Sequence, residues 1–543
     1  MDSYEEKASY TKRYRNAKKI LKRVFKYDNF KPYQYKIIDN ILNVKDVIAI
    51  MPTGYGKSLC FQLPPLITKE LAIVVSPLIA LMTDQKIILD KLGITSCCYN
   101  STIGIKKKRE IEKELLEGKY QIMYITPETL VNSHYLIDKL YSDVGICMLA
   151  IDEAHCLSSY GFDFRPAYRE IINIRNLLKG VPVLAVTATA TDTVAKDIID
   201  LMDMKNGELI QTSFDRPNLT INVNQYNSSS IDDIIDIISN VDGSSIVYCL
   251  TQKDTEKMSD TLCEAGIRAK AYHGGLSKDV RTETQEGFMN DAYDCIAATI
   301  AFGMGINKAN VRVVIHHGCP QNIDSYYQEI GRAGRDGKKA DCFLYYKQRD
   351  FIIQQKFISE IKDVRYRAIR KKLLYDISQY VGTQTCRRKV ILKYFGEDTK
   401  TQNCSNCDNC LSGTKKIIVI KKGNEHKLYK VLNIVMTSLA EKNTSYGATT
   451  IGLILKGSNS KKIKTWMKEL TYYGGMSEVK TKDISSFIEH IKAIGYLESY
   501  NVSECIYALR CTSRGYDFGK AYETKLNDDM MNCDISNRVT LNY

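Results

Sequence analysis

A glycine-containing loop is the first segment of this sequence that could carry chemistry. The apolar run Val47–Ile50 leads into MPTGYGKS, residues 51–58, and then into a helical pattern. Tight glycine turns between a strand and a helix aim backbone N–H groups at phosphates. We predict that Lys57 reaches the β- and γ-phosphates of a nucleotide and that Ser58 holds Mg²⁺, although Met51 replaces the first glycine of the general pattern. The loop residues predicted to bind the nucleotide are Thr53, Gly54, Gly56, Lys57 and Ser58.

Two adjacent carboxylates end a second apolar run. Asp152 and Glu153 directly follow Met148–Ile151. A carboxylate at this strand end can bind the Mg²⁺ shared with Ser58, and the next carboxylate can polarise the attacking water. A glycine–lysine loop or a pair of acids can each arise by chance. Together, in this order along the chain, they indicate nucleotide hydrolysis.

Four cysteines make a second candidate site. Cys386 is followed by Cys404, Cys407 and Cys410, and the last three are separated by two residues each. This spacing lets successive thiolates turn onto one tetrahedral ion, and Cys386 completes the four-coordination. We predict a closed, structural Zn²⁺ site whose binding is coupled to folding. Iron–sulfur ligation is the alternative metal chemistry, and ordinary core thiols are the alternative without a metal.

These residues need elements that bring them together, and the chain has the rhythm of parallel α/β sheets. Up to residue 210, short apolar runs alternate with helix-length amphipathic stretches, and a second series follows a break at residues 214–218. Parallel sheets covered by helices on both faces have this pattern. We predict two doubly wound domains. Their expected strands are Val47–Ile50, Ala72–Val75, Ile122–Ile125, Met148–Ile151 and Val183–Val186, then Ser245–Tyr248, Ala269–Tyr272, Cys295–Ala298, Val311–His316 and Cys342–Tyr346.

The composition limits the classes of protein to which the chain can belong. Its 543 residues suffice for about three or four domains with real cores, which excludes disorder as the main state. Lys and Arg outnumber Asp and Glu by 76 to 63, a net charge of +13 that weakly favours a polyanionic partner, and residues 361–393 carry ten basic side chains against two acidic ones. The 17 scattered cysteines argue against a disulfide framework. Because we find no signal peptide and no membrane-length apolar stretch, we expect a soluble intracellular protein without a membrane partner, in the nucleus or, in a bacterium or virus, the cytoplasm.

With these motifs in place, the chain resembles the RecQ family of ATP-dependent DNA helicases. Residues 27–34, YDNFKPYQ, resemble the adenine-reading segment of that family. The resemblance implies that Tyr27 stacks on the base and that Gln34 hydrogen-bonds its edge, while Lys31 stands where the family usually has arginine. Further segments similar to family motifs are residues 76–85, 126–128, 187–189, 272–276 and 298–308.

The segment YYQEIGRAGRDG, residues 326–337, is the most specific match to the family. By resemblance, Arg335 is the arginine finger, Arg332 contacts the γ-phosphate and Gln328 helps to seat the nucleotide. These residues lie in the second predicted domain, whereas the phosphate loop lies in the first. Hydrolysis would therefore require a closed cleft, and ATP would act as the switch for closure.

A loop rich in aromatic residues follows the carboxylate pair. Residues 159–166, SYGFDFRP, resemble the family loop that senses single-stranded DNA. The resemblance implies DNA contacts from Tyr160, Phe162, Phe164 and Arg165, and exposed rings with a guanidinium suit the stacking of unpaired bases. Tyr160 stands where the family usually has tryptophan, and Phe162 where histidine is common. The alternative is that both phenylalanines anchor the following helix in the core.

The C-terminal part resembles the zinc-binding and winged-helix modules of the family. Within 425–520, Lys461 and Lys462 would contact duplex phosphates, or they form part of a solvated face, and residues 494–511 would form the wing hairpin. The implied fold is two tandem RecA-like parallel-sheet domains, a small helical zinc-binding domain and a winged helix, without the extra C-terminal helical domain of longer family members. The expected limits are 1–208, 209–345, 346–412 and 423–522, with a polar tail at 523–543 that we expect to be disordered from Asn527.

The resemblance implies an ATP- and Mg²⁺-dependent DNA helicase that also binds Zn²⁺. Such an enzyme would translocate 3′ to 5′ on single-stranded DNA and unwind duplex DNA in repair, recombination or replication. Polarity comes from the family alone. Two alternatives stay open: an RNA helicase or a translocase that does not unwind, and a DNA-binding module with an inactive motor. The intact Lys57, Asp152, Glu153 and Arg335 argue against the last of these.

Overall fold

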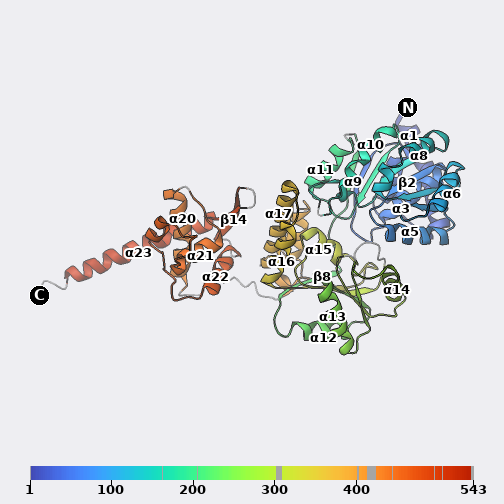
Figure 1. The fold of residues 1–543 in the computed structure, drawn as a ribbon. Coiled ribbons are helices and arrows are strands. Elements are labelled where there is room, and N and C mark those ends of the chain that lie inside the picture. Colours follow the sequence, from blue (N-terminus) through green and yellow to red (C-terminus); the bar gives the residue numbers. More distant parts are fainter. Residues whose placement is uncertain are drawn as a thin grey trace. The chain divides into compact units, whose positions relative to one another are not determined.

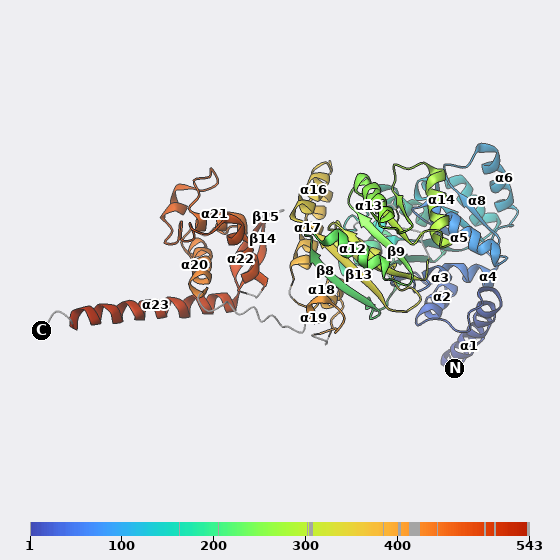
Figure 2. The same cartoon turned by 90° about the horizontal axis from the view of Figure 1, so that it is seen from below.

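The computed structural model describes residues 2–161, 163–204, 206–300, 302, 308–383, 385–399, 403–411, 424–442, 444–493, 496–503 and 506–539 (Figures 1 and 2). The chain forms two compact units. The first consists of Met1–Ile377 with Arg388–Cys407, and the second of Ser378–Arg387 with Asp408–Tyr543. No helix within the described ranges is both long enough and apolar enough to cross a membrane.

The first sheet has seven parallel strands in the order β3-β4-β2-β5-β6-β1-β7. The five predicted runs are confirmed as strands. The sequence pattern misses β3 and β7 because they lie at the two edges of the sheet: β3 is made of Ser, Cys and Tyr, and β7 buries a single residue. The bounds are β1 Val47–Ile50, β2 Leu71–Val75, β3 Ser96–Tyr99, β4 Ile122–Ile125, β5 Ile146–Ile151, β6 Val183–Thr187 and β7 Glu208–Gln211.

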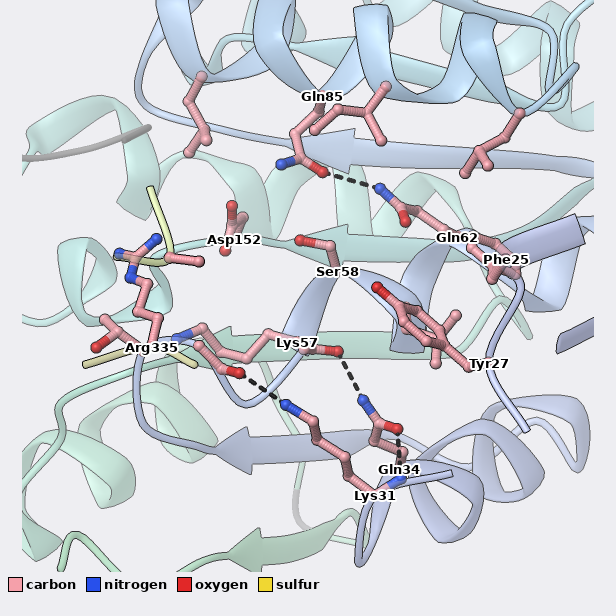
Figure 3. Close-up of a pocket in the computed structure, with 18 of the residues that line it drawn as sticks. Phe25, Tyr27, Lys31, Gln34, Lys57, Ser58, Gln62, Gln85, Asp152 and Arg335 are labelled. Carbon is pink, nitrogen blue, oxygen red and sulfur yellow. Dashed lines mark hydrogen bonds between the residues drawn. The ribbon is translucent and has the colours of Figure 1, made fainter. Parts of the chain in front are cut away.

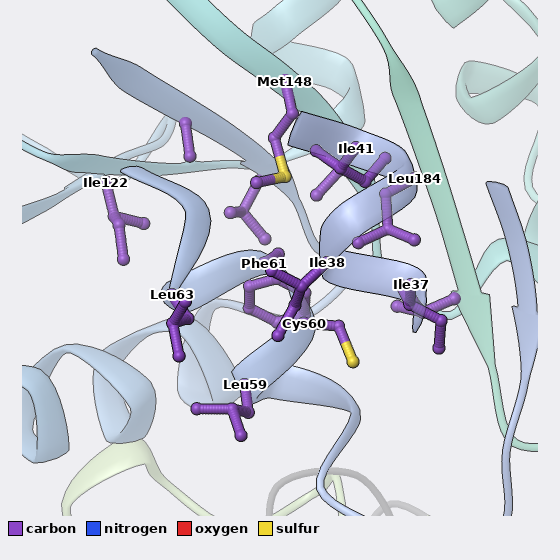
Figure 4. Packing of buried hydrophobic residues seen from close by; sticks show 14 of the residues in the cluster. Ile37, Ile38, Ile41, Leu59, Cys60, Phe61, Leu63, Ile122, Met148 and Leu184 are labelled. Carbon is purple, nitrogen blue, oxygen red and sulfur yellow. The ribbon is translucent and has the colours of Figure 1, made fainter. Parts of the chain in front are cut away.

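Helices connect these strands and pack around the sheet (Figure 1). Ile38 and Ile41 of α2 and Phe61 of α3 share one buried cluster with Met148 of β5 and Leu184 of β6 (Figure 4). Burial of such a side chain contributes about 1.5–3 kcal/mol, so this cluster fixes α3 and the loop before it on the sheet. The helices are α1 Asp2–Ile20, the π-helix η1 Leu21–Phe25, α2 Gln34–Leu42, α3 Lys57–Gln62, α4 Pro64–Thr68, α5 Ile79–Lys91, α6 Ile105–Leu116, α7 Pro127–Val131, α8 His134–Asp143, the 3₁₀ helix η2 Ala154–Leu157, α9 Pro166–Arg169, α10 Ile171–Leu177 and α11 Asp192–Leu201.

The second sheet has six parallel strands in the order β10-β11-β9-β12-β13-β8. All five predicted runs are again strands, and the unpredicted β8 is an edge strand in which buried and less buried residues alternate. Two parallel-sheet domains are thus confirmed. The elements are β8 Leu219–Gln225, α12 Ser230–Ser239, β9 Ser244–Cys249, α13 Gln252–Glu264, β10 Ala269–Tyr272, α14 Lys278–Met289, β11 Cys295–Ala298, β12 Val311–His317, α15 Ile323–Ile330 and β13 Ala340–Tyr346.

The remaining chain is mainly helical. The basic segment forms α17 and α18, and the C-terminal module has its own apolar core, against which Trp466 packs. The expected wing hairpin is present, because β14 and β15 pair antiparallel. The elements are α16 Gln348–Ser359, α17 Val364–Gly382, α18 Arg387–Tyr394, α19 Asp408–Leu411, α20 Glu425–Lys442, α21 Ala448–Lys456, the 3₁₀ helix η3 Thr465–Glu469, α22 Thr481–Ala493, β14 Leu497–Ser503, β15 Ile506–Cys511 and α23 Ser513–Val539.

The expectation of disorder from Asn527 is wrong for the residues up to Val539. α23 begins at Ser513 and ends at Val539. Its first turns are anchored by Phe518, whose ring lies 5.5 Å from that of Tyr496, centroid to centroid. Once a helix is nucleated, each further residue adds a hydrogen bond at little cost, and no Pro or Gly interrupts residues 520–539.

Candidate active site and metal-binding cluster

A cavity of about 600 Å³ opens at the carboxyl ends of β1 and β5 (Figure 3). Residues from both parallel-sheet domains line it, and both domains belong to the first compact unit. The cavity brings together every residue predicted to bind ATP or to act in its hydrolysis. These are Tyr27, Lys31, Gln34, Thr53, Gly54, Gly56, Lys57, Ser58, Asp152, Glu153, Gln328, Arg332 and Arg335.

The phosphate loop needs its glycines for their backbone conformation. Gly54 and Gly56 have φ values of +78° and +86°, in the left-handed region that residues with a Cβ rarely adopt. A Cβ atom on Gly56 would also lie 2.6 Å from Nε2 of Gln34. That amide nitrogen donates to the carbonyls of Tyr55 and Gly56, at 3.2 and 3.0 Å, so it braces the loop from outside. The geometry is a backbone cradle that fits phosphate groups.

Lys57 begins α3 and points its ammonium group into the loop. Nζ donates to the carbonyl of Met51 at 3.0 Å. Burial lowers the pKa of Lys57, while the carboxylates of Glu153 and Asp152 oppose this effect. Burial and the neighbouring Glu153 raise the pKa of Asp152. The site therefore holds buried charges of both signs before any ligand enters.

The donors around Asp152 suit magnesium. Its carboxylate and the hydroxyl of Ser58 face the same cavity (Figure 3). Oxygen ligands, few of them from the protein, are what Mg²⁺ prefers beside nucleotide phosphates. Ser58 and Asp152 would hold the ion, which when bound neutralises charge that develops on the phosphates.

Glu153 lies next to a buried hydrogen-bonded pair, His155 and Thr187. Its φ of +49° is unusual for a residue with a side chain, and such strain is concentrated at functional sites. Its Oε2 lies 3.4 Å from Nδ1 of His155, which in turn lies 2.9 Å from the hydroxyl of Thr187. Burial lowers the pKa of His155, so the ring is neutral at physiological pH. This contact links the carboxylate to residues 187–189, one of the segments similar to family motifs.

The second domain places its arginines against the phosphate loop. A Cβ atom on Gly54 would lie 3.4 Å from Cγ of Arg335, and the hydroxyl of Thr53 donates to the carbonyl of Gly331 at 2.9 Å. Burial, and then the charge of Arg332, lower the pKa of Arg335 to about 9. Arg332 itself is 4% exposed. A buried cation beside a partly buried one makes a site at which a bound anion would be stabilising.

The adenine end of the cavity differs from the sequence expectation in detail. Tyr27 is 60% exposed at the mouth, a position open to stacking. Gln34 is buried, and its oxygen accepts from the backbone N–H of Lys31 at 2.8 Å while its nitrogen binds the phosphate loop. Nζ of Lys31 donates to the carbonyl of Gly54 at 2.8 Å. Gln34 and Lys31 thus organise the loop, and recognition of adenine by Gln34 stays a prediction.

The aromatic loop lies beside the same machinery. Arg165 donates to the carbonyl of Pro77 at 3.0 Å, and the hydroxyl of Tyr168 donates to the carbonyl of Asp152 at 3.1 Å. Tyr160 is 49% exposed. The ring of Phe164, by contrast, packs 5.7 Å from that of Tyr366 in α17, and Phe162 lies outside the described residues.

The four predicted zinc ligands lie together. The Sγ atoms of Cys386, Cys404, Cys407 and Cys410 are all within 4.8 Å of one another. Four thiolates at ~2.3 Å from one Zn²⁺ are separated by roughly 3.8 Å, so the cluster fits a tetrahedral ion. Cys386 directly precedes α18, and Cys410 lies within α19.

Two exposed lysines mark the C-terminal module. Lys461 and Lys462 are exposed between α21 and η3, as phosphate contacts would require. The neighbouring Lys456 instead donates to the carbonyl of Val479 at 3.0 Å and is part of the internal structure. Tyr500 of β14 is held by the hydroxyl of Ser445.

Sequence reasoning missed several groups that shape the cavity. Gln62 donates to Gln85 at 2.9 Å along its wall. Gln285 of the second domain donates to Asp84 of the first at 3.0 Å, a second contact across the cleft. No role is predicted for Arg216 either, although it lies in residues 214–218, which break the strand pattern. These polar residues have no distinctive spacing, and their partners are far away in sequence.

Comparison with known proteins supports one family. Four family models match in succession: DEAD/DEAH box helicase at 31–198, helicase conserved C-terminal domain at 229–337, RecQ zinc-binding at 348–411 and RQC domain at 426–527. The DEAD-box helicase Mss116 bound to single-stranded RNA shares the fold, with a TM-score of 0.50 at 18% identity over 69% of this chain and 89% of that one.

Relatives in sequence are closer. The ATP-dependent DNA helicase RecQ of Bacillus subtilis is 36% identical over 480 residues, covering 88% of this chain and 79% of that protein. The RecQ of Haemophilus influenzae is 34% identical over 483 residues, covering 89% and 76%. A protein of Acanthamoeba polyphaga mimivirus that is named as an ATP-dependent RNA helicase is 45% identical over 506 residues, covering 92% and 91%. The succession of matched domains and these relatives show that the chain belongs to the RecQ family of ATP-dependent DNA helicases.

Proposed function

We propose that this helicase hydrolyses ATP in the cavity between its two parallel-sheet domains and uses the cycle to move 3′ to 5′ along single-stranded DNA, unwinding the duplex ahead. The observation that carries the proposal is the single cavity in which Lys57, Asp152 and Glu153 of the first domain meet Arg332 and Arg335 of the second. Neither domain alone presents the full set. Hydrolysis is therefore tied to closure of the cleft, and repeated closure moves the strand.

Each side chain has a role that its position supports. Lys57 leaves the carbonyl of Met51 to bind the β- and γ-phosphates, since a phosphate is the stronger acceptor for an ammonium group. Glu153 orients and polarises the attacking water. Arg335 stabilises the charge that spreads over the γ-phosphoryl group in the transition state. Gln328 and Arg332 seat the phosphates, and Tyr27 stacks on the base.

We propose DNA contacts at two places. Tyr160, Phe164 and Arg165, with Phe162, sense the single strand, and Lys461 and Lys462 bind duplex phosphates. Arg165 of the aromatic loop donates to the carbonyl of Pro77, and Tyr168 of the following helix α9 donates to the carbonyl of Asp152 in the ATP site. This proximity supports a signalling role.

The proposed domain limits are 1–208, 209–345, 346–412 and 423–522, and the four family matches fall within these limits or pass them by a few residues. Limited proteolysis with trypsin should cut first in the lysine-rich stretch between the third and fourth of these domains.

The direct test is strand displacement with purified protein on tailed duplexes. We expect ATP-dependent unwinding of a 3′-tailed DNA duplex and none of a 5′-tailed one; the reverse preference would contradict the polarity. Lys57→Ala should reduce ATP turnover at least a hundredfold and leave most DNA binding, because the two ligands are held by different groups. Wild-type turnover in this variant would remove Lys57 from the mechanism.

RNA unwinding is the second candidate function, because the mimiviral relative is named as an RNA helicase. ATPase rates with single-stranded DNA and with RNA of the same sequence separate the two. Stronger stimulation by RNA would favour the RNA substrate.

A further inference from the structure

Residues 212–218, between β7 and β8, connect the two parallel-sheet domains and also bind the turn that carries Arg332 and Arg335. We call this segment the connector. Arg216 lies within it, and the guanidinium reaches the turn that follows α15. Its Nη2 donates to the carbonyls of Ala333 and Gly334, at 2.9 and 3.0 Å, and its Nη1 donates to that of Gly331 at 3.4 Å. One side chain thus binds three carbonyls of the turn that carries Arg332 and Arg335.

This turn depends on outside support. It is not part of a regular helix or strand, and Gly334 has a φ of +56°. Nδ2 of Asn218, from the same connector, donates to the carbonyls of Gly334 and Lys338, at 3.0 and 2.9 Å. A planar guanidinium with several fixed donors can hold several carbonyls at once, which an ammonium group cannot do with the same geometry.

The backbone on both sides of Arg216 is itself clamped. Arg388 of α18 donates to Asp215 at 2.7 Å and to the carbonyls of Arg216 and Leu219 at 2.6 Å. Nδ2 of Asn406 donates to the carbonyls of Pro217 and Leu219, at 2.9 and 3.0 Å.

The clamp sits next to the predicted zinc ligands. Arg388 lies two positions after Cys386, and Asn406 directly precedes Cys407. On the other side, the ring of Phe214 stacks on that of Phe395 with centroids 4.4 Å apart. Arg388, Asn406 and the ring of Phe395 therefore hold the connector on the side of the cysteine cluster. On the other side, Arg216 and Asn218 bind the turn that follows α15.

We propose that Arg216 is a positioning residue that holds Arg335 and Arg332 in the geometry needed to reach the triphosphate, and that Arg388 and Asn406 fix Arg216 from the cysteine cluster. The inference rests on the proposed role of Arg335 in hydrolysis. By this proposal the zinc-binding module contributes to ATP hydrolysis, because its residues Arg388 and Asn406 bind the backbone of the connector. The triphosphate can still bind Lys57 and its loop when the turn is loose, so the loss should fall on turnover.

The test compares Arg216→Gln with the parent protein in DNA-stimulated ATP hydrolysis. We expect kcat to fall by about 10- to 100-fold, since small misplacement of a catalytic group is this costly, with the KM for ATP and the Kd of a non-hydrolysable ATP analogue within about threefold. Arg216→Lys keeps the charge with fewer donors and should lose less. Zinc content and melting temperature are measured on each variant.

Arg175→Gln is the matched control. Arg175 of α10 also donates to a carbonyl, that of Val181, and binds Asp46 at 2.8 Å, but it lies outside the ATP cavity. This variant should lose stability without a comparable loss of kcat. The proposal is overturned if Arg216→Gln keeps kcat within twofold, if Arg175→Gln loses as much at equal loss of stability, or if the affinity for the ATP analogue falls in parallel with kcat. Full turnover in Lys57→Ala would instead refute the proposed function, whatever Arg216 does.

Discussion

Replacing Arg335 with methionine should make the nucleotide-free protein more stable while it destroys hydrolysis. Methionine keeps an unbranched apolar stem against Gly54 and removes the charge. Burial and the charge of Arg332 lower the pKa of Arg335 well below its ordinary value, to about 9. The folded state therefore disfavours the bound proton. At pH 7, below both pKa values, the guanidinium is charged in the folded and unfolded states, so its full unfavourable contribution is present.

The size of the effect follows from that change. The lowered pKa corresponds to a destabilisation of the charged guanidinium in the folded state by about 5 kcal/mol, as an upper bound. Any hydrogen bond of the charged guanidinium is lost with the charge, at about 1.5–3 kcal/mol each. We expect a net gain of about 1–3 kcal/mol in the free energy of unfolding, or a rise of roughly 2–8 °C in melting temperature. Loss of an arginine finger should lower kcat by about 10³–10⁵.

The assay is thermal unfolding with and without a non-hydrolysable ATP analogue and Mg²⁺, beside steady-state ATPase measurements. The parent should gain more from the analogue than the variant does, because the triphosphate neutralises Arg335 in the parent alone. A variant that melts below the parent without nucleotide, and gains as much from the analogue, would refute the electrostatic reasoning. Unchanged kcat would refute the assignment of Arg335.

Two further predictions concern the metal and the DNA. Cys404→Ser should lower zinc content and soluble yield more than it lowers the ATPase rate per folded molecule, measured by metal analysis and active-site titration; normal folding of the parent in a strong chelator would contradict a structural zinc. Tyr160→Ala should raise the DNA concentration that half-maximally stimulates ATPase by about 5- to 150-fold, which corresponds to about 1–3 kcal/mol for one stacked base, with the DNA-independent rate unchanged. Equal stimulation of the variant and the parent would assign Tyr160 no base contact.

The sequence predicts the centre of each sheet better than its edges. Strands such as Val47–Ile50 and Val183–Thr187 are buried on both faces, so they read as short apolar runs. Edge strands such as Glu208–Gln211 are half exposed, and their polar residues hide the pattern. Some residues of the ATP site are predictable for a related reason: the phosphate loop and Asp152 follow the buried strands β1 and β5, and the spacing of the site residues within each motif is local.

The roles of single polar side chains are less predictable. Arg216 lies in a segment that breaks the strand pattern, and its carbonyl partners are more than a hundred positions away. Gln34 is expected at the base of the nucleotide, yet its amide braces the phosphate loop. Phe164 is expected to contact DNA, and its ring has a further partner in Tyr366, which belongs to a helix after the second sheet. In each case tertiary contacts, which no local pattern encodes, decide the partner.

The charges of the empty cavity explain why the motor can couple binding to closure. Arg332 is buried there, Lys57 and Arg335 are partly exposed, and the ammonium group of Lys57 donates to the carbonyl of Met51. A triphosphate offers these cations a better partner and offsets the cost of burying them. Two of the three belong to the second domain, so the nucleotide gains most when that domain lies against the phosphate loop. Because Arg216 binds the turn of Arg332 and Arg335 to the connector, movement of this turn toward the nucleotide can move the rest of the second domain as well. Release of phosphate then removes the attraction between the nucleotide and these cations, so the cleft can open.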